Sequence, residues 1–264
     1  MAILSIISMA LAAVVLPQIK LSRVIEEKWN TLEAAGAAFK AEYLARLKDE
    51  TPDYDTLFEL KAERVLELGK NRVVYQLLDE ESRINLNTAP KGILLRLPGL
   101  QSETVVDEIL AYRQARPFAL KEELLLVNGV DKEIYSQCRD YITVWTSGEV
   151  NVNTASATVL AALGMGERLI SSLINFRKGP DGLAGTEDDG AFKNLADFIN
   201  DLDHYSDLTG DEVTLLQNLI SQNRLTVKSN VLDFESRVSF LSQPARRYAA
   251  VFNLSENKAL RWEE

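Results

Sequence analysis

An internal repeat constrains the fold of this chain more strongly than any other feature of its sequence. The segment beginning at Ile84 reads Ile-Asn-Leu-Asn-Thr-Ala, and the segment beginning at Val150, 66 residues later, reads Val-Asn-Val-Asn-Thr-Ala. Two copies are too few for a solenoid, in which neighbours cover each unit. The repeat therefore predicts a duplicated helical unit. Its further matched residues are Ile93, Leu94 and Leu97 with Val159, Leu160 and Leu163, Tyr112-Arg113 with Phe176-Arg177, and Phe118 and Leu124 with Phe192 and Phe198.

Each copy predicts two helices joined by a tight glycine turn. Apolar residues at steps of three and four mark helices over 90–97 and 102–114 in the first copy, and over 156–163 and 167–178 in the second. Gly99 and Gly164 supply the positive φ that such turns need. A further turn is expected at Gly129, with Asp131 as the helix cap, and its counterpart at Gly210.

The asparagine-rich segment that opens each copy is expected to cap the first helix. Asn87 or Thr88, and Asn153 or Thr154, can accept hydrogen bonds from free N–H groups of the first turn. The result is a helix-hairpin-helix pattern. Such turns can bind a phosphate backbone through their N–H groups, or they can serve as a protein-packing module.

Charge favours the packing alternative. The 264-residue chain has 29 basic and 39 acidic residues, and its net charge is −10. Acidic residues also flank the turns, so we expect no nucleic acid partner. Those flanking residues are Glu103, Asp107, Glu108 and Glu167. The single cysteine, Cys138, and the single histidine, His204, exclude an internal disulfide and metal sites built from several cysteines or several histidines. We therefore do not expect this chain to be an enzyme.

One insertion distinguishes the second copy. The spacing from Arg177 to Phe192 is ten residues longer than that from Arg113 to Phe118, and the insertion forms a loop over Gly179–Gly190. The loop has four carboxylates and four glycines but no basic residue, which is typical of a calcium site and departs from the EF-hand spacing. The alternatives are a solvated loop without metal and a pair of catalytic carboxylates. The candidate ligands are Asp181, Leu183, Thr186, Glu187, Asp188 and Asp189.

The amino-terminal segment is apolar. Residues 1–19 contain no charged residue, which is just enough to span a membrane as a helix. A cleaved signal peptide fits poorly because no basic region precedes the run, and a buried helix of a soluble protein is the other alternative. An apolar stripe over 21–50 continues the helix, and Thr51-Pro52-Asp53 is expected to end it. The residues of this stripe are Val24, Ile25, Trp29, Leu32, Ala35, Phe39, Tyr43 and Leu47.

The carboxyl-terminal segment predicts strands. β-branched and aromatic residues over 225–231, 237–240, 247–254 and 259–262 predict an antiparallel meander. An earlier candidate strand, 72–78, precedes the repeat and is expected to join this sheet. The helical repeat is then an insertion within an α/β domain.

Taken together, these residues resemble the type IV pilin-like superfamily, and within it the K-type minor pseudopilins of type II secretion (general secretion pathway protein K). The resemblance rests on the entry Asp79-Glu80-Glu81 before Ile84, the second Asn-Val-Asn-Thr-Ala segment, and the ending Leu260-Arg261-Trp262-Glu263. It implies an α+β fold, with a long amino-terminal helix on a small antiparallel sheet and a large inserted all-α domain of helix-hairpin-helix (SAM-like) units.

The resemblance also implies a domain organisation. We expect a hydrophobic helix over 1–22, the pilin helix and first strand over 23–82, and closing strands over 223–264. The inserted domain is expected over 83–222, with its repeats over 83–148 and 149–222. Such proteins are made with a basic leader ending in glycine, and we expect Met1 to lie inside the apolar segment after a truncated start.

By resemblance, the chain is expected to be a single-pass protein of the bacterial inner membrane, with its soluble part in the periplasm and a place at the pseudopilus tip. Its expected partners are the I-type and J-type minor pseudopilins and the inner-membrane secretion platform. Its inserted domain is expected to bind calcium. A membrane-tethered DNA receptor of a competence system is the alternative, because such receptors also carry Asn-x-Asn-Thr-Ala before helix-hairpin-helix turns. A periplasmic hydrolase that uses the acidic loop is a further alternative.

Overall fold

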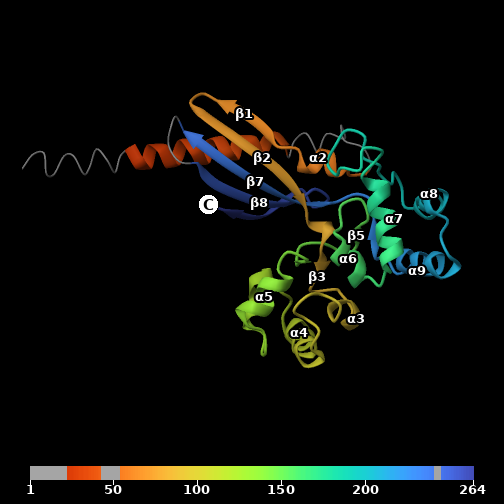
Figure 1. Cartoon of the computed structure of the whole chain (residues 1–264). Helices are drawn as coiled ribbons and strands as arrows, with labels where there is room; N and C mark the ends of the chain where they lie inside the picture. Colours follow the sequence, from red (N-terminus) through yellow and green to blue (C-terminus); the bar gives the residue numbers. More distant parts are fainter. Residues whose placement is uncertain (1–22, 43–53, 241–244) are drawn as a thin grey trace, which may run out of the picture.

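The computed structural model describes residues 23–42, 54–240 and 245–264, and it confirms the predicted α+β fold. Residues 23–42 form a helix that lies along a five-stranded antiparallel sheet of order β1-β2-β7-β8-β9 (Figure 1). The strands are β1 (Arg64–Leu68), β2 (Asn71–Asp79), β7 (Val231–Phe240), β8 (Arg246–Asn253) and β9 (Lys258–Glu263). Residues 1–22 and 43–53, where we predicted the apolar helix, its continuation and its end, lie outside the described residues.

Small side chains bring the helix close to the sheet. Ala34, Ala35 and Ala38 are buried in the same core cluster as Val73 and Phe234. Their short side chains let the backbone of the helix come close to that of the sheet. The Thr31 hydroxyl lies 2.8 Å from the Tyr248 hydroxyl at this interface.

The predicted stripe on this helix was therefore wrong at its beginning. Val24, Ile25 and Trp29 are exposed, with 66% of Trp29 accessible. Leu32, Ala35 and Phe39 do pack into the core, as expected. The buried face also includes Thr31, Ala34 and Ala38, which the predicted stripe did not contain, because small side chains fit closely against the surface of a sheet.

The predicted sheet is largely confirmed. Strand β2 pairs with β7 across the whole inserted segment, and β7, β8 and β9 form the expected meander. The prediction for 225–231 was wrong, because Leu225 and Thr226 form β6 and pair in parallel with β5 of the repeat. Strand β1, which pairs with β2 through a turn at Gly69, was not predicted.

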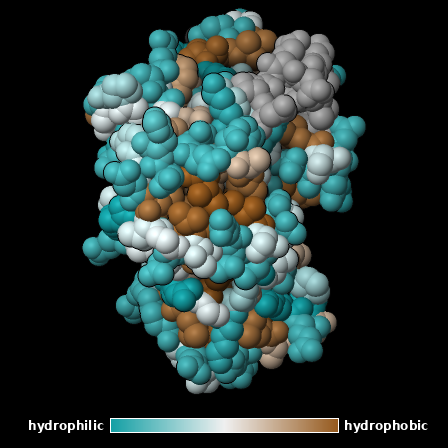
Figure 2. Space-filling model, turned by 90° about the vertical axis from the view of Figure 1, so that its right-hand side faces the viewer, coloured by the Kyte–Doolittle hydropathy of each residue, from teal (hydrophilic) through white to brown (hydrophobic). Residues whose placement is uncertain are grey.

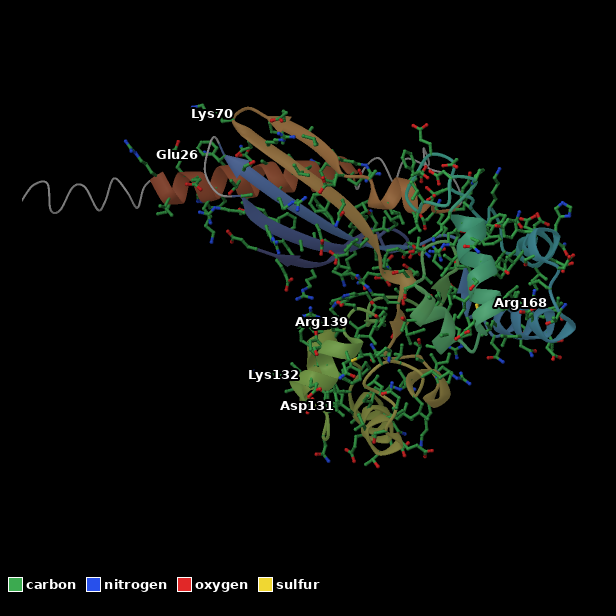
Figure 3. All side chains as sticks on the ribbon, in the orientation of Figure 1. Glu26, Lys70, Asp131, Lys132, Arg139 and Arg168 are labelled. Carbon is green, nitrogen blue, oxygen red and sulfur yellow. The ribbon has the colours of Figure 1, made fainter. Side chains whose placement is uncertain are left out.

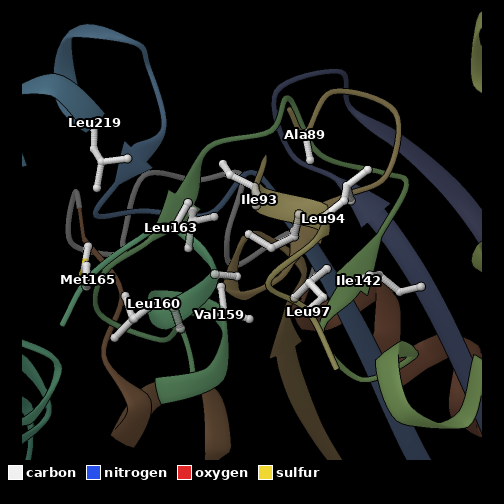
Figure 4. Packing of buried hydrophobic residues seen from close by; sticks show 14 of the residues in the cluster. Ala89, Ile93, Leu94, Leu97, Ile142, Val159, Leu160, Leu163, Met165 and Leu219 are labelled. Carbon is white, nitrogen blue, oxygen red and sulfur yellow. The ribbon is translucent and has the colours of Figure 1, made fainter. Parts of the chain in front are cut away.

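The inserted helices form two similar units with one core. Ile93, Leu94 and Leu97 from the first copy meet Leu160 and Leu163 from the second in this core (Figure 4). The first copy comprises β3 (Ile84–Asn85), α3 (Lys91–Leu94), α4 (Glu103–Ala115), η2 (Lys121–Leu126), α5 (Lys132–Cys138) and β4 (Ile142–Thr143). The second comprises β5 (Val150–Asn151), α6 (Ala157–Ala162), α7 (Glu167–Arg177), α8 (Phe198–Ser206), α9 (Gly210–Ser221) and β6 (Leu225–Thr226).

A parallel pair of two-residue strands closes each copy, β3 with β4 and β5 with β6. We call these copies repeat one and repeat two. They lie at the end of the sheet where β2 finishes, next to the short helix α2 (Leu57–Lys61) (Figure 1). Glu26, on the amino-terminal helix, and Arg168, on α7 of repeat two, therefore lie near opposite ends of the molecule (Figure 3).

The predicted turns are confirmed except for one. Gly99, Gly129 and Gly164 all have positive φ. Gly210 instead begins α9, and the left-handed residue before that helix is Asp207, with φ of 48°. The capping box between Thr209 and Glu212 fixes this helix start without a glycine turn.

None of the helices within the described residues is both long enough and apolar enough to cross a membrane.

Candidate metal loop and carboxylate junction

The asparagines of the repeat join distant segments and do not cap helices. In repeat one, the Asn87 side chain donates to the Phe118 carbonyl at 3.0 Å and accepts from the Phe118 N–H at 2.8 Å. In repeat two, Asn153 makes the same pair of bonds to Phe192 at 2.9 and 2.8 Å. Pro90 and Ser156 occupy the cap positions, so the capping prediction was wrong.

The aligned arginines support the same segments. Arg113 donates to the carbonyls of Leu86 and Ala89 at 2.7 and 2.8 Å. Arg177 donates to Ala155 at 2.7 Å and Val152 at 3.3 Å. Burial lowers the pKa of Arg177 to about 10, and the nearby Asp189 carboxylate opposes that shift. The acidic loop thus stands next to the buried arginine of repeat two.

The acidic loop brings five of its six predicted ligands together. Asp181 accepts from the Leu183 N–H at 2.7 Å, and Asp188 accepts from the Asp181 N–H at 3.1 Å. The Thr186 hydroxyl donates to Asp188 at 2.9 Å and lies 3.4 Å from both Asp189 and the Leu183 carbonyl. These contacts gather carboxylate, hydroxyl and carbonyl oxygens in one loop.

Glu187 takes no part in these hydrogen bonds. Together with Thr186 and Asp189 it lines a cavity of about 280 Å³ between the loop and the segment that leads into α2. The other walls of the cavity include Tyr54, Thr56 and Glu59. The loop therefore lies against the sheet domain as well as on repeat two.

Two glycines let the loop close. A Cβ on Gly179 would lie 2.1 Å from the Asp188 carbonyl oxygen, and Gly179 has φ of 63°. A Cβ on Gly190 would lie 2.3 Å from the Phe176 carbonyl oxygen. Any side chain at these positions would force the two ends of the loop apart.

The donor set suits a hard cation. The Thr186 hydroxyl and the Asp181 N–H lower the pKa of Asp188, so this carboxylate is charged at neutral pH. No three Asp, Glu, His or Cys side chains among the described residues lie close enough to hold a metal by themselves. A cation here would need the Leu183 carbonyl and the Thr186 hydroxyl as well, and calcium accepts such mixed oxygen ligands.

A second polar site was missed by sequence reasoning. Asp79, Glu80 and Glu81 are three consecutive carboxylates at the end of β2 and in the 3-10 turn η1 (Glu80–Ser82), and all three are at least 95% buried. We call them, together with Asp55, the carboxylate junction. Three acidic residues directly after an apolar strand were the available signal, because buried carboxylates need dedicated partners.

Each carboxylate of the junction binds a different part of the molecule. Asp79 accepts from Asn151 of repeat two at 3.0 Å. Glu80 accepts from Thr143 of repeat one at 2.5 Å. Glu81 accepts from the N–H groups of Asn230 and Val231, at the start of β7, at 3.1 and 3.2 Å. The junction therefore connects the sheet with both repeats.

The hairpin turns of repeat one pack against protein. A Cβ on Gly99 would lie 2.8 Å from the Ile134 carbonyl oxygen of α5, and one on Gly129 would lie 3.3 Å from Val105 of α4. The backbone of each turn thus touches the other hairpin's helix. This packing supports the protein-module interpretation of the pattern.

Comparisons with known proteins agree with these observations. Residues 79–143 match the helix-hairpin-helix motif family, and residues 150–222 match the family of the type II secretion system protein K. No curated protein matches the sequence. A chain from the crystal structure of the GspK-GspI-GspJ complex of the enterotoxigenic Escherichia coli type 2 secretion system has a TM-score of 0.66. It is 15% identical, the match covers 94% of this chain and 98% of that one, and at this identity the likeness shows the fold.

Proposed function

We infer that the chain belongs to the protein K family of the type II secretion system and acts there as a minor pseudopilin. The observation that carries this conclusion is the match of residues 150–222 to that family. The shared fold extends the likeness to 94% of the chain. The role is structural, in a filament that serves protein export.

The position we propose in the filament is its tip. The two repeats add a second hydrophobic core at one end of the sheet, where a packed filament would need room for the subunit above (Figure 1). A subunit of this shape fits best where no subunit follows. From that position it would start or cap the assembly.

The proposed partners are the I-type and J-type minor pseudopilins. The related fold comes from a complex of GspK with GspI and GspJ. Val24, Ile25 and Trp29 support a helix–helix contact, since they form an exposed apolar area on the amino-terminal helix. Seen from the helical end, the molecule also has hydrophobic areas bounded by hydrophilic ones (Figure 2).

The proposed location follows from the apolar run over 1–19. We propose that this segment holds the protein in the bacterial inner membrane beside the secretion platform, with the remaining residues in the periplasm. After assembly the same segment would pack among the helices of the filament. The absence of charge over its whole length supports both states.

We also propose that the acidic loop binds calcium. The support is the convergence of Asp181, Leu183, Thr186, Asp188 and Asp189 and the lowered pKa of Asp188. Bound calcium would neutralise the loop and fix it against repeat two. Glu187 is the sixth candidate ligand, and it lines the same cavity as Thr186 and Asp189.

The test is co-purification. Residues 23–264 are expressed with the soluble parts of the I-type and J-type pseudopilins in calcium, and the mixture is examined by size-exclusion chromatography with light scattering. One peak at the summed mass is expected. Trp29→Ser should weaken that complex, whereas Phe58→Ser, an exposed apolar residue on α2, should leave it intact. Separate peaks from folded partners, together with salt-dependent DNA binding, would favour the receptor alternative.

A further inference from the structure

The amide nitrogen of Asn151 is shared by two carboxylates. Asn151 Nδ2 lies 3.0 Å from Asp79 Oδ2, 3.1 Å from Asp55 Oδ2 and 3.1 Å from the Ser229 hydroxyl. A side-chain amide has two hydrogens, so it cannot serve three acceptors at once. The two carboxylate oxygens must also lie near each other, since both touch the same nitrogen.

Both of these carboxylates are buried. Asp55 is 1% exposed and Asp79 is 5% exposed. The groups that donate hydrogen bonds to Asp79 are neutral: the Asn151 amide, the Thr154 and Ser229 hydroxyls and the Glu81 N–H. If the Asp55 and Asp79 carboxylates were both charged, they would repel each other strongly, because they lie close together and are shielded from water.

Neighbouring charged groups are directed elsewhere. Glu80 pairs with Arg83, and Arg177 donates to the carbonyls of Val152 and Ala155. Glu81 faces the start of β7, where it accepts from the N–H groups of Asn230 and Val231, and burial together with the Asp79 carboxylate raises its pKa to about 9. Burial and the Asp55 carboxylate accordingly raise the pKa of Asp79 to about 7.

We propose that Asp55 and Asp79 share one proton, and that this proton latches repeat two to the end of the sheet. The latch is well placed for this task. Asp55 precedes α2 and accepts from the Ser229 N–H at 2.5 Å, just before β7, while Asp79 ends β2 and holds Asn151 of β5. Loss of the proton leaves two carboxylates facing each other around one amide, and the contact between sheet and repeat loosens.

The sign of the pH dependence follows from the direction of the shift. The pKa of Asp79 is higher in the folded protein than the unfolded value near 4, so the native state binds the proton more tightly. The latch is therefore fully closed below about pH 4. It weakens as the pH rises toward 7.

Repeat one provides the internal control. Asn85 aligns with Asn151, but its amide donates to the Thr146 carbonyl at 2.5 Å inside its own repeat. No carboxylate contacts that amide among the described residues. The latch is thus confined to repeat two, although both copies open with the same motif.

The experiment is hydrogen exchange on the full chain in mild detergent with EDTA between pH 5 and 8, corrected for the intrinsic exchange rates. Protection of the peptide that contains Ser229, Asn230 and Val231 should fall by up to about tenfold per pH unit from pH 5 to 7. Asp79→Asn should remove this dependence, and Asp55→Asn is a second variant if the first fails to fold. Protection independent of pH in the unmodified chain would overturn the proposal.

Asp233→Asn is the matched control. Burial raises the pKa of Asp233 to about 7 as well, but this residue lies on β7 near Glu80 and Glu235. The variant should leave the local pH dependence at 229–231 in place. If it removes that dependence as fully as Asp79→Asn does, the proton is not held by the latch.

A second control tests whether a cation closes the junction. If calcium added in place of EDTA restores protection of the peptide that contains residues 229–231 at pH 8 in the Asp188→Asn variant, a cation and not a proton closes the junction, and the proposal is wrong.

Discussion

Repeat one and repeat two have the same internal bonds but different surroundings. Asn87 and Asn153 each hold a phenylalanine backbone, and Arg113 and Arg177 each hold two carbonyls. Repeat two has in addition the acidic loop and the contact of Asn151 with Asp55 and Asp79. The bonds that the two copies share therefore build the fold, and the sites for which we propose a function depend on residues outside the shared pattern, namely the acidic loop and the carboxylates Asp55 and Asp79.

The largest expected difference between the repeats concerns their asparagines. Asn153 is 2% exposed, whereas Asn87 is half-buried. Asn153→Ala leaves the N–H and the carbonyl of Phe192 unpaired in a dry core, and should lower the free energy of unfolding by about 3 kcal/mol. Asn87→Ala should lower it by about half as much, because water can reach its partners. Urea unfolding of both variants measures the difference, and equal losses would contradict the burial argument.

The next difference concerns calcium. Saturating calcium, at about 100 times its dissociation constant, should stabilise the protein by about 2.7 kcal/mol if only the native state binds. Asp188→Asn and Asp189→Asn, in the loop of repeat two, should remove this effect. Asp131→Asn, which changes an exposed acidic cap in repeat one, should leave it unchanged. Thermal unfolding with calcium and with EDTA is the measurement, and a calcium response that persists in the double variant would place the ligands elsewhere.

The glycine turns should differ by a smaller amount. Gly99→Ala places a methyl group 2.8 Å from the Ile134 carbonyl oxygen at a positive φ, and should cost about 2 kcal/mol. Gly164→Ala meets only Arg96, at 3.7 Å, and should cost about 1 kcal/mol from the backbone conformation alone. Denaturant midpoints of the two variants test this order. The reverse order would mean that the first hairpin can shift away from α5.

The smallest expected effect concerns the caps of the last helix in each repeat. Thr209→Ala breaks the capping box of α9 and should cost about 1 kcal/mol, slightly more than Asp131→Ala at α5, which has no box. The pKa of Glu212 in this box is lowered, since the Thr209 N–H and Arg168 stabilise its charge against the opposing effect of burial. This contribution is present above about pH 4 and is lost as the pH falls further, which an acid titration of stability would detect.

Much of the fold followed from local patterns. The repeat, the helices α4 and α7, the turns at Gly99 and Gly164, and the β7–β9 meander were all predicted, because period and glycine position are properties of neighbouring residues. Strand β1 was missed, since it has only five residues, and its charged residues, Arg64 and Glu67, lie on opposite faces and obscure the alternation of a strand. The wrong assignment of 225–231 has a different cause, because β6 is defined only by its distant partner β5.

The acidic loop shows the same division. The sequence located it, and the structure joins five of the six candidate ligands through hydrogen bonds within the loop, in which Glu187 takes no part. Spacing alone could not separate Glu187 from Asp188, because they are adjacent in the chain. Which residues of the loop bond to one another depends on the closure of the loop at Gly179 and Gly190.

By itself, the sequence determined the duplication, the α+β composition, the position of the acidic loop and the likeness of residues 150–222 to the protein K family, all of which depend on residue type and spacing along the chain. Only the tertiary structure decided what Asn87 and Asn153 bind, and where Asp55, Asp79 and Asn151 meet. The physical reason is that a buried polar group must find its partner in space. Asn151 has two such partners: Asp55 lies 96 residues away from it in the chain, and Asp79 lies 72 residues away. No periodicity in the sequence can reveal partners at these separations.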